Sequence, residues 1–172
     1  MPFSCLSPEE FDPVIRRIGK DFLLISVSDG ERVNTMTASW GGVGYFWNRP
    51  VALCMIRPQR YTYGLVEKTD RLSLSFFEPA EQYRSALSYC GRTSGRDTDK
   101  FAGAGLTPVF EDGIPYPAEA DTVLLCRKLY ADDFRRSAFL DPSLLENYRA
   151  NDFHRLYVCE IQTIRKAVGP KK

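Results

Sequence analysis

The sequence of 172 residues lacks an apolar run of the roughly 20 residues that a membrane span needs. Residues 1–5 also lack the basic and then apolar order of a secretory signal. Its 23 lysines and arginines nearly balance 22 aspartates and glutamates, so the formal net charge is only +1. A chain with so little net charge has no general attraction for nucleic acid or an anionic membrane surface. We therefore expect a cytoplasmic protein that binds neither of them, and any anion must be held by a local group of cations.

The sequence also lacks closely spaced cysteines. Its five cysteines are Cys5, Cys54, Cys90, Cys126 and Cys159. Zinc sites and redox dithiols use close pairs, so this spacing predicts no metal site. Four of the five lie in apolar stretches, where a cysteine packs as a small hydrophobic residue, and we expect free thiols. A catalytic thiol has no support in this pattern.

No repeat, low-complexity tract or linker divides the chain, and 44% of the residues are hydrophobic. We therefore predict a single domain over residues 1–172. Apolar alternation and turn residues predict strands at 22–28, 33–41, 51–56, 72–76, 122–130 and 154–164. The run at 51–56 is expected to be buried on both sides, and residues 103–117 to be mostly loop with a short strand or two. Helical spacing or capping predicts helices at 7–19, 62–68, 81–91 and 143–149. These elements predict a mainly β fold, an antiparallel barrel with peripheral helices.

Residues 33–41 form a strand whose two faces differ. Thr35, Thr37 and Ser39 share one face, and Met36, Ala38 and Trp40 share the other. Farther along, Arg57 and Arg60 precede a helix that Thr62 is expected to cap. Because a helix start offers free amides and a partial positive charge, two arginines beside it suit a phosphate. The alternative is that both arginines are solvated surface charges.

A second candidate for anion binding is the polar loop of residues 92–100. Arg92, Arg96 and Lys100 supply charge close to Ser94 and Thr98. The alternative is a flexible surface loop with internal pairing between aspartate and arginine. Neither segment has the strand, glycine-rich turn and helix of a P-loop or a dinucleotide fold, so these nucleotide folds are excluded.

Three of these segments together resemble one known family. Residues 34–40 followed by 57–62 are similar to the N-x-M-T-x-S-W and R-x-x-R-Y-T signature of the flavin reductase-like family, which has the FMN-binding split-barrel fold. Residues 94–101 resemble its S-G-R-D-x-D-K-F loop, and residues 122–128 and 154–161 resemble its late strands. The resemblance extends over roughly residues 22–164. Cys159 stands where relatives commonly have glycine, which leaves the local strand geometry open.

The resemblance implies that FMN lies in a groove at a homodimer interface, with backbone amides of the strand at 34–40 along its ring. Arg60, Tyr61 and Thr62 would hold the phosphate, and the loop at 94–100 would close over the cofactor. Hydroxyls of Thr37 and Ser39 would add bonds to the ring or ribityl chain, while Arg57 is the weaker member. The implied cofactor-binding residues are Asn34, Thr35, Met36, Thr37, Ala38, Ser39, Trp40, Arg57, Arg60, Tyr61, Thr62, Ser94, Gly95 and Lys100.

The implied reaction is hydride transfer from NADH or NADPH to flavin N5, with electrons passing on to free flavin, a redox partner protein or a small acceptor. No catalytic side chain is identified, because the first step needs no side-chain acid. His154, the only histidine, either positions a substrate or is an ordinary residue at a strand end. Two alternatives are a flavoredoxin-like electron carrier with little turnover of NAD(P)H, and a cofactor-free β-barrel that serves as an interaction module. The aromatic residues Trp40, Tyr45, Phe46 and Trp47 would line the ring or nicotinamide, or pack in a dimer.

Overall fold

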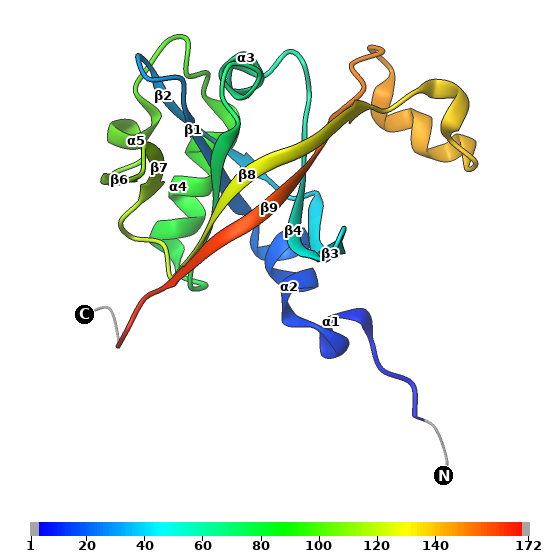
Figure 1. The fold of residues 1–172 in the computed structure, drawn as a ribbon, viewed down its shortest axis with the longest axis horizontal. Helices are drawn as coiled ribbons and strands as arrows, with labels where there is room; N and C mark the ends of the chain where they lie inside the picture. The colour runs from blue at the N-terminus through cyan, green and yellow to red at the C-terminus, as the bar shows by residue number, and fades with distance from the viewer. Residues whose placement is uncertain (1–3, 170–172) are drawn as a thin grey trace.

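The computed structural model describes residues 4–169, and its main feature is a seven-stranded antiparallel sheet (Figure 1). A second sheet pairs β6 (Pro108–Glu111) with β7 (Ile114–Pro117). The structure therefore confirms the predicted class, mainly antiparallel β with helices at the periphery. In spatial order the large sheet contains β2 (Val33–Ala38), β1 (Leu23–Ser28), β5 (Arg71–Phe76), β8 (Thr122–Asp133), β9 (Arg155–Lys166), β4 (Arg49–Ile56) and β3 (Gly41–Phe46).

The two edges of this sheet lie close to each other. β2 and β3 are its edge strands, yet only Ser39 and Trp40 connect the end of β2 to the start of β3. Such a short connection forces the sheet to curl until its edges approach, which forms a barrel that is open between β2 and β3. The predicted strand at 33–41 is therefore divided, because the chain turns from one edge to the other after Ala38.

Two hydrophobic clusters pack against the central strands. In β1, Ile25 belongs to the cluster enclosed by the curled sheet, whereas its neighbour Leu24 belongs to the cluster beside helix α4 (Glu81–Arg92). Because side chains alternate between the faces of a strand, both faces of β1 are buried, which explains its continuous apolar run. The run at 51–56 is different: Leu53 and Met55 are only half-buried, so the prediction of burial on both sides was wrong for β4.

The cysteines behave mainly as core residues. Cys54, Cys126 and Cys159 are buried in the enclosed cluster and Cys90 in the cluster beside α4, while Cys5 is exposed. Burial raises the pKa of the Cys90 thiol to about 11, so this group stays protonated at neutral pH. These observations agree with the prediction of free, structural thiols.

The N-terminal helix differs from its prediction. The capping box is present, since Ser7 accepts from the Glu10 amide and the Glu10 carboxylate accepts from the Ser7 amide. However, the chain becomes extended at Asp12, because proline cannot continue the first helix at position 13. The result is α1 (Pro8–Phe11), α2 (Pro13–Arg16) and a π-helical turn, Arg17–Asp21. Ile18 is buried, but Phe11 is 79% exposed.

Two other helices depart from the sequence pattern. α3 (Tyr61–Val66) begins one residue earlier than predicted, and Arg60 rather than Thr62 is its N-cap residue. The predicted helix at 143–149 is a 3₁₀ helix, Pro142–Tyr148, although Asp141 does cap it by accepting from the Ser143 amide. The remaining elements are α5 (Lys100–Gly103) and a short 3₁₀ helix, Arg136–Ala138. Within residues 4–169, no helix has the length and apolar character to cross a membrane.

Two serines on the same face of β5 provide a test of the core. Both are fully buried, but the Ser73 hydroxyl donates to the Pro115 carbonyl over 2.6 Å, whereas the Ser75 hydroxyl has no hydrogen-bond partner among residues 4–169. An unpaired buried hydroxyl is destabilising, so Ser75→Ala should leave the free energy of unfolding unchanged or raise it. Ser73→Ala should lower it by about 1–3 kcal/mol, because the carbonyl loses its donor. Urea unfolding of both variants measures the difference, and equal losses would contradict this interpretation.

Candidate functional site

β2 provides main-chain groups at the edge of the barrel. Its outer side has no strand partner within the part of the chain that the structure describes. An edge strand leaves about half of its N–H and C=O groups outside the ladder, where they can bind a ligand. α4 packs beside this strand, and the Thr37 hydroxyl donates to the Leu87 carbonyl over 2.5 Å.

A hollow of about 320 Å³ lies where β2, the start of α3, the end of α4 and the start of α5 meet. We call it the cationic hollow, because four of its side chains carry a positive charge and none is a carboxylate. Such a cluster attracts an anion, and the charge comes from side chains more than from α3, which has only six residues. Its lining residues are Asn34, Met36, Gln59, Arg60, Tyr61, Thr62, Arg92, Thr93, Ser94, Gly95, Arg96 and Lys100.

Lys100 is the most unusual member of the cationic hollow. It is only 5% exposed, and it forms no ion pair with any carboxylate of residues 4–169. Burial lowers its pKa, and the positive charge of Arg60 lowers it further. A buried ammonium without a counter-ion is unfavourable, so an anion that enters the hollow would relieve this cost.

The hollow is assembled from three separate stretches of the sequence. The Asn34 amide on β2 donates to the buried Thr62 hydroxyl on α3 over 2.8 Å. Gly95 lies against Asn34 and against Tyr61, the neighbour of Thr62: a Cβ at this position would stand 2.1 Å from Asn34 Oδ1 and 2.9 Å from Tyr61 Cδ1. Only glycine fits this close approach, which places the loop of residues 94–100 over the corner.

A smaller hollow of about 210 Å³ continues along β2, and we call it the strand-edge hollow. It shares Met36 and Arg60 with the cationic hollow, so the two hollows adjoin along β2, and we call them together the groove. The remainder of its wall is uncharged except for Arg57 and the titratable ring of His154. Its lining residues are Met36, Thr37, Ala38, Ser39, Trp40, Met55, Arg57, Arg60 and His154.

All the predicted cofactor-binding residues except Thr35 line one of these two hollows. Thr35 is fully buried, and its hydroxyl accepts from Ser26 and donates to the Ile25 carbonyl, so its side chain does not face a ligand. Thr37 does line the groove, but its hydroxyl proton is engaged with Leu87. On the hydroxyl face predicted for residues 34–40, the hydroxyls of Thr35 and Thr37 therefore form hydrogen bonds within the protein.

Arg57 lines the strand-edge hollow, but its charge is already paired. Its guanidinium forms an ion pair with Asp152, donates to the Asn147 carbonyl over 2.9 Å and stacks on the Tyr148 ring. The guanidinium also holds the pKa of the Asp152 carboxyl below its usual range. Arg57 therefore anchors the segment of residues 134–154 beside the groove, and its contact with a cofactor stays a prediction.

His154 precedes β9 rather than beginning it, and it is 8% exposed. Its Nδ1 lies 2.9 Å from the Tyr148 hydroxyl, and its ring centroid lies 5.0 Å from that of Trp40. Burial, reinforced by the charge of Arg57, lowers its pKa to about 4. The ring is therefore neutral at pH 7, which makes it a wall of the groove and a hydrogen-bonding group rather than a cation.

The predicted aromatic cluster is divided between two places. Trp40 lines the strand-edge hollow beside His154. Tyr45, Phe46 and Trp47 lie instead at the β3–β4 hairpin, where they are exposed and line neither hollow.

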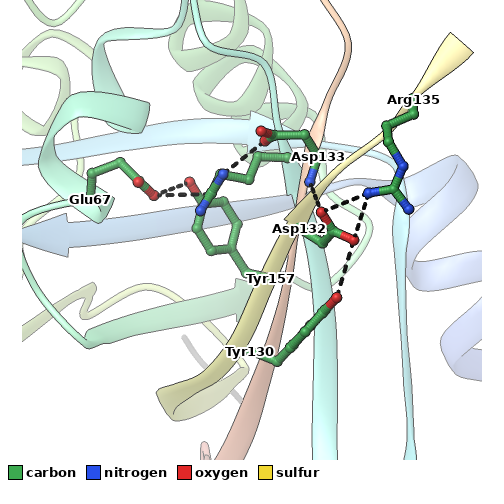
Figure 2. A network of polar contacts seen from close by, with 7 residues as sticks. Glu67, Tyr130, Asp132, Asp133, Arg135 and Tyr157 are labelled. Carbon is green, nitrogen blue, oxygen red and sulfur yellow. Dashed lines mark hydrogen bonds and ion pairs between the residues drawn. The ribbon is translucent and has the colours of Figure 1, made fainter.

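A polar network holds the far end of α3 (Figure 2). Glu67, which follows the helix, accepts from the Tyr157 hydroxyl over 2.7 Å and pairs with Arg155. Arg155 also donates to Asp133 over 2.9 Å, and neighbouring Asp132 accepts from Tyr130 and Arg135. Because Asp133 lies on β8 and Arg155 and Tyr157 lie on β9, this pair of strands fixes the end of α3. The other end of the same helix carries Arg60, Tyr61 and Thr62.

Several lining residues were not among those implied by the family resemblance. Arg92 and Arg96 were noted as charges in their loop, but only the fold brings them to the same hollow as Arg60. The sequence predicts that Met55 is buried in a strand, but it lines the strand-edge hollow because its face of β4 is only partly buried. Gln59 carried no sequence signal beyond its place between two arginines.

The low pKa of His154 has a consequence for stability. The histidine of the unfolded chain has a pKa near 6.5, whereas the folded protein holds it at about 4, so only the unfolded state gains a proton between these values. The free energy of unfolding should therefore fall by up to about 3 kcal/mol as the pH is lowered from about 6.5 to about 4. Urea unfolding measures this slope, which His154→Gln should reduce. As a check, NMR of this single histidine should show no titration near pH 6.5; a midpoint there would contradict the assignment.

Comparison with known proteins identifies the family of the chain. The family model described as "Flavin reductase like domain" matches residues 15–169. A search of curated proteins found no match. Among solved structures, an FMN-binding protein from Thermus thermophilus with bound p-hydroxybenzaldehyde has 26% sequence identity and a TM-score of 0.67, covering 86% of this chain and 72% of that chain.

Two further structures have the same fold at lower identity. The flavoredoxin of Desulfovibrio vulgaris (Miyazaki F) has 23% identity and a TM-score of 0.64, covering 85% of this chain and 68% of that one. An NADH:FAD oxidoreductase from Streptomyces globisporus has 18% identity and a TM-score of 0.65, covering 97% and 89%. The predicted FMN-binding split-barrel fold is thus confirmed, and the chain belongs to the flavin reductase-like domain family.

Proposed function

We propose that this chain binds FMN and acts as an NADH- or NADPH-dependent flavin reductase. The single observation that carries the proposal is the continuous groove, in which an uncharged length of β2 leads into a hollow with four cations and no carboxylate. A ligand with a flat polar ring and a phosphate tail matches that order. When bound, FMN supplies a ring that accepts a hydride and releases electrons one or two at a time.

Each part of the groove has a distinct role in this proposal. Arg60 and Lys100 hold the phosphate, because charge-assisted hydrogen bonds to such groups are the strong ones. Free amides on the outer edge of β2 bind the polar atoms of the ring, where donors stabilise negative charge. Trp40 and Met55 cover the groove and exclude water, and neutral His154 keeps the wall beside the ring uncharged.

We also propose that the chain is one domain that works as a homodimer. β3 is an edge strand, and Tyr45, Phe46 and Trp47 at its end are exposed to solvent. An unpaired edge with exposed aromatic side chains is usually covered by a partner. Light scattering during size-exclusion chromatography measures the mass in solution directly, and a mass of about 20 kDa would contradict the dimer.

A flavoredoxin-like electron carrier is the second candidate, because two of the structures with this fold are named flavoredoxins. Both functions require bound flavin, and they differ in the reaction with nicotinamide. Stopped-flow mixing of the FMN-loaded protein with NADH or NADPH, under anaerobic conditions, should bleach the flavin absorbance within seconds if the chain is a reductase. Absence of bleaching with either donor would favour the carrier.

The charge of Lys100 allows a direct test of the phosphate position. Lys100→Met should weaken FMN binding at least tenfold, which corresponds to about 1.4 kcal/mol, because the phosphate loses a buried cation. The same change should leave the melting temperature of the cofactor-free protein unchanged or higher, since a buried unpaired charge is removed. Arg60→Ala should cost about 1.5–3 kcal/mol of FMN binding.

Fluorescence quenching of FMN measures the affinity, and Lys68→Met serves as the control because the Lys68 side chain is 64% exposed and pairs with Asp29. Wild-type protein that fails to quench FMN would contradict the proposed function. Unchanged FMN affinity in Lys100→Met and Arg60→Ala would support the alternative of a barrel without cofactor, or a cofactor held elsewhere.

A further inference from the structure

The side chains of Tyr148 and His154 form a buried pair beside the strand-edge hollow. Tyr148 ends the 3₁₀ helix Pro142–Tyr148, in the arm that leaves the large sheet between β8 and β9 (Figure 1). It is 3% exposed, and its hydroxyl lies 2.9 Å from His154 Nδ1. Its ring centroid lies 4.8 Å from that of Phe153 and 5.2 Å from the Arg57 guanidinium. These contacts fix the position of the hydroxyl.

The hydrogen bond within this pair determines which imidazole nitrogen carries a proton. Burial raises the pKa of the Tyr148 hydroxyl and lowers that of His154, so at pH 7 the hydroxyl is protonated and the imidazole is neutral. The Tyr148 hydroxyl has no other hydrogen-bond partner among residues 4–169, so Nδ1 is the acceptor for its proton. The single proton of the neutral imidazole therefore lies on Nε2.

The Nε2 atom of His154 has no partner within the described part of the chain. The residue is buried, yet the enclosed side-chain atoms without a partner in residues 4–169 are Ser75 Oγ and Arg155 Nε. Nε2 is not one of them, so it keeps an accessible surface. His154 lines the strand-edge hollow next to Trp40. We infer that its N–H is directed toward this hollow.

Two other polar side chains of the strand-edge hollow are already engaged. The Arg57 guanidinium pairs with Asp152, and the Thr37 hydroxyl donates to the Leu87 carbonyl. His154 differs from both, because one of its nitrogens is anchored while the other is left to a ligand. A donor whose direction is fixed before the ligand binds does not have to reorient when charge develops on that ligand.

We propose that His154 donates a hydrogen bond from Nε2 to a polar atom of the ring of bound FMN, and that Tyr148 is the positioning residue that keeps the proton on this nitrogen. The proposal rests on the proposed function, because the ring must lie in the strand-edge hollow. The polar edge of the flavin ring has carbonyl oxygens and nitrogens that accept hydrogen bonds. A donor at this edge stabilises the negative charge that the ring gains on reduction.

The position of the proton is tested first, in the protein without flavin. Because His154 is the only histidine, ¹⁵N NMR of the full chain reports its two ring nitrogens directly. At pH 7 the wild type should have a protonated Nε2 and an unprotonated Nδ1. Tyr148→Phe removes the hydroxyl and should give a mixture of both tautomers. Tyr130→Phe is the matched control, because it removes a hydroxyl that donates to Asp132 away from the groove.

Two NMR results would overturn the proposal. A wild-type proton on Nδ1, or on both nitrogens at pH 7, would contradict the donor at Nε2. A tautomer that is the same in wild type and Tyr148→Phe would contradict the positioning role. Neither result depends on flavin binding.

The hydrogen bond to the ring is tested by spectroelectrochemistry of the FMN-loaded protein. His154→Leu should weaken the preference for reduced over oxidised FMN about tenfold, which lowers the two-electron midpoint potential by about 30 mV. Tyr148→Phe should weaken this preference about threefold, or by about 14 mV. His154→Gln should restore most of the wild-type potential, because its amide also donates. Tyr130→Phe should leave the potential unchanged, and circular dichroism establishes that each variant is folded.

The outcomes distinguish this proposal from the proposed function. A lower potential in His154→Leu that recovers in His154→Gln supports the hydrogen bond. FMN binding with one potential in wild type, His154→Leu and Tyr148→Phe would overturn the bond and leave the proposed function intact. Equal losses in His154→Leu and His154→Gln would also overturn it, since the imidazole would then act by its shape and not as a donor. Wild type that binds no FMN would overturn both.

Discussion

The buried charge of Lys100 is the constraint on which the site depends. An ammonium does not enter a protein interior without a cause, since losing its hydration costs several kcal/mol. Here the two neighbouring residues fix the position of Lys100. Phe101 is buried in the cluster beside α4, and Asp99 caps α5, so the backbone on both sides of Lys100 is held in place. Burial of an aromatic side chain contributes roughly 2–3 kcal/mol and opposes that cost. Core packing thus holds in place a charge that remains available for a ligand.

The groove also depends on how the barrel closes. Because only Ser39 and Trp40 connect the edge strands β2 and β3, the barrel stays open at this point and the outer side of β2 remains unpaired. A closed barrel would use those amides in its ladder and leave nothing for a ring to bind. The end of the groove at the cationic hollow is fixed through α3. Asn34 holds one end of this helix, and the network around Glu67 holds the other. The free edge of β2 and the side chains at the start of α3 therefore belong to elements that are positioned independently.

The sequence was sufficient for the fold class and for most strand positions, because alternation and turn residues are local signals, but it did not predict β3. It failed where a side chain's surroundings come from distant parts of the chain. Thr62 has the appearance of a cap, but its hydroxyl is held by Asn34 from another strand. Arg57 lies close to Arg60 in the sequence, but only the fold shows that its charge is paired with Asp152, far along the chain. Thr35 and Thr37 share a polar face in the sequence, yet their hydroxyls form hydrogen bonds with β1 and α4. Gly95 is the opposite case, since its role follows from a close approach that no local pattern reveals.

The charges along the groove also determine which way round a ligand can bind. At the strand-edge hollow, burial keeps His154 neutral and Asp152 pairs with Arg57, so the remaining positive charge is that of Arg60, which this hollow shares with the cationic hollow. At the other end, Arg60, Arg92, Arg96 and Lys100 face each other without a carboxylate among them. A molecule with a neutral ring and an anionic tail therefore gains attraction in one orientation only. The ion pair of Arg57 and the burial of His154 both contribute to this difference, because each reduces the positive charge at the strand-edge hollow.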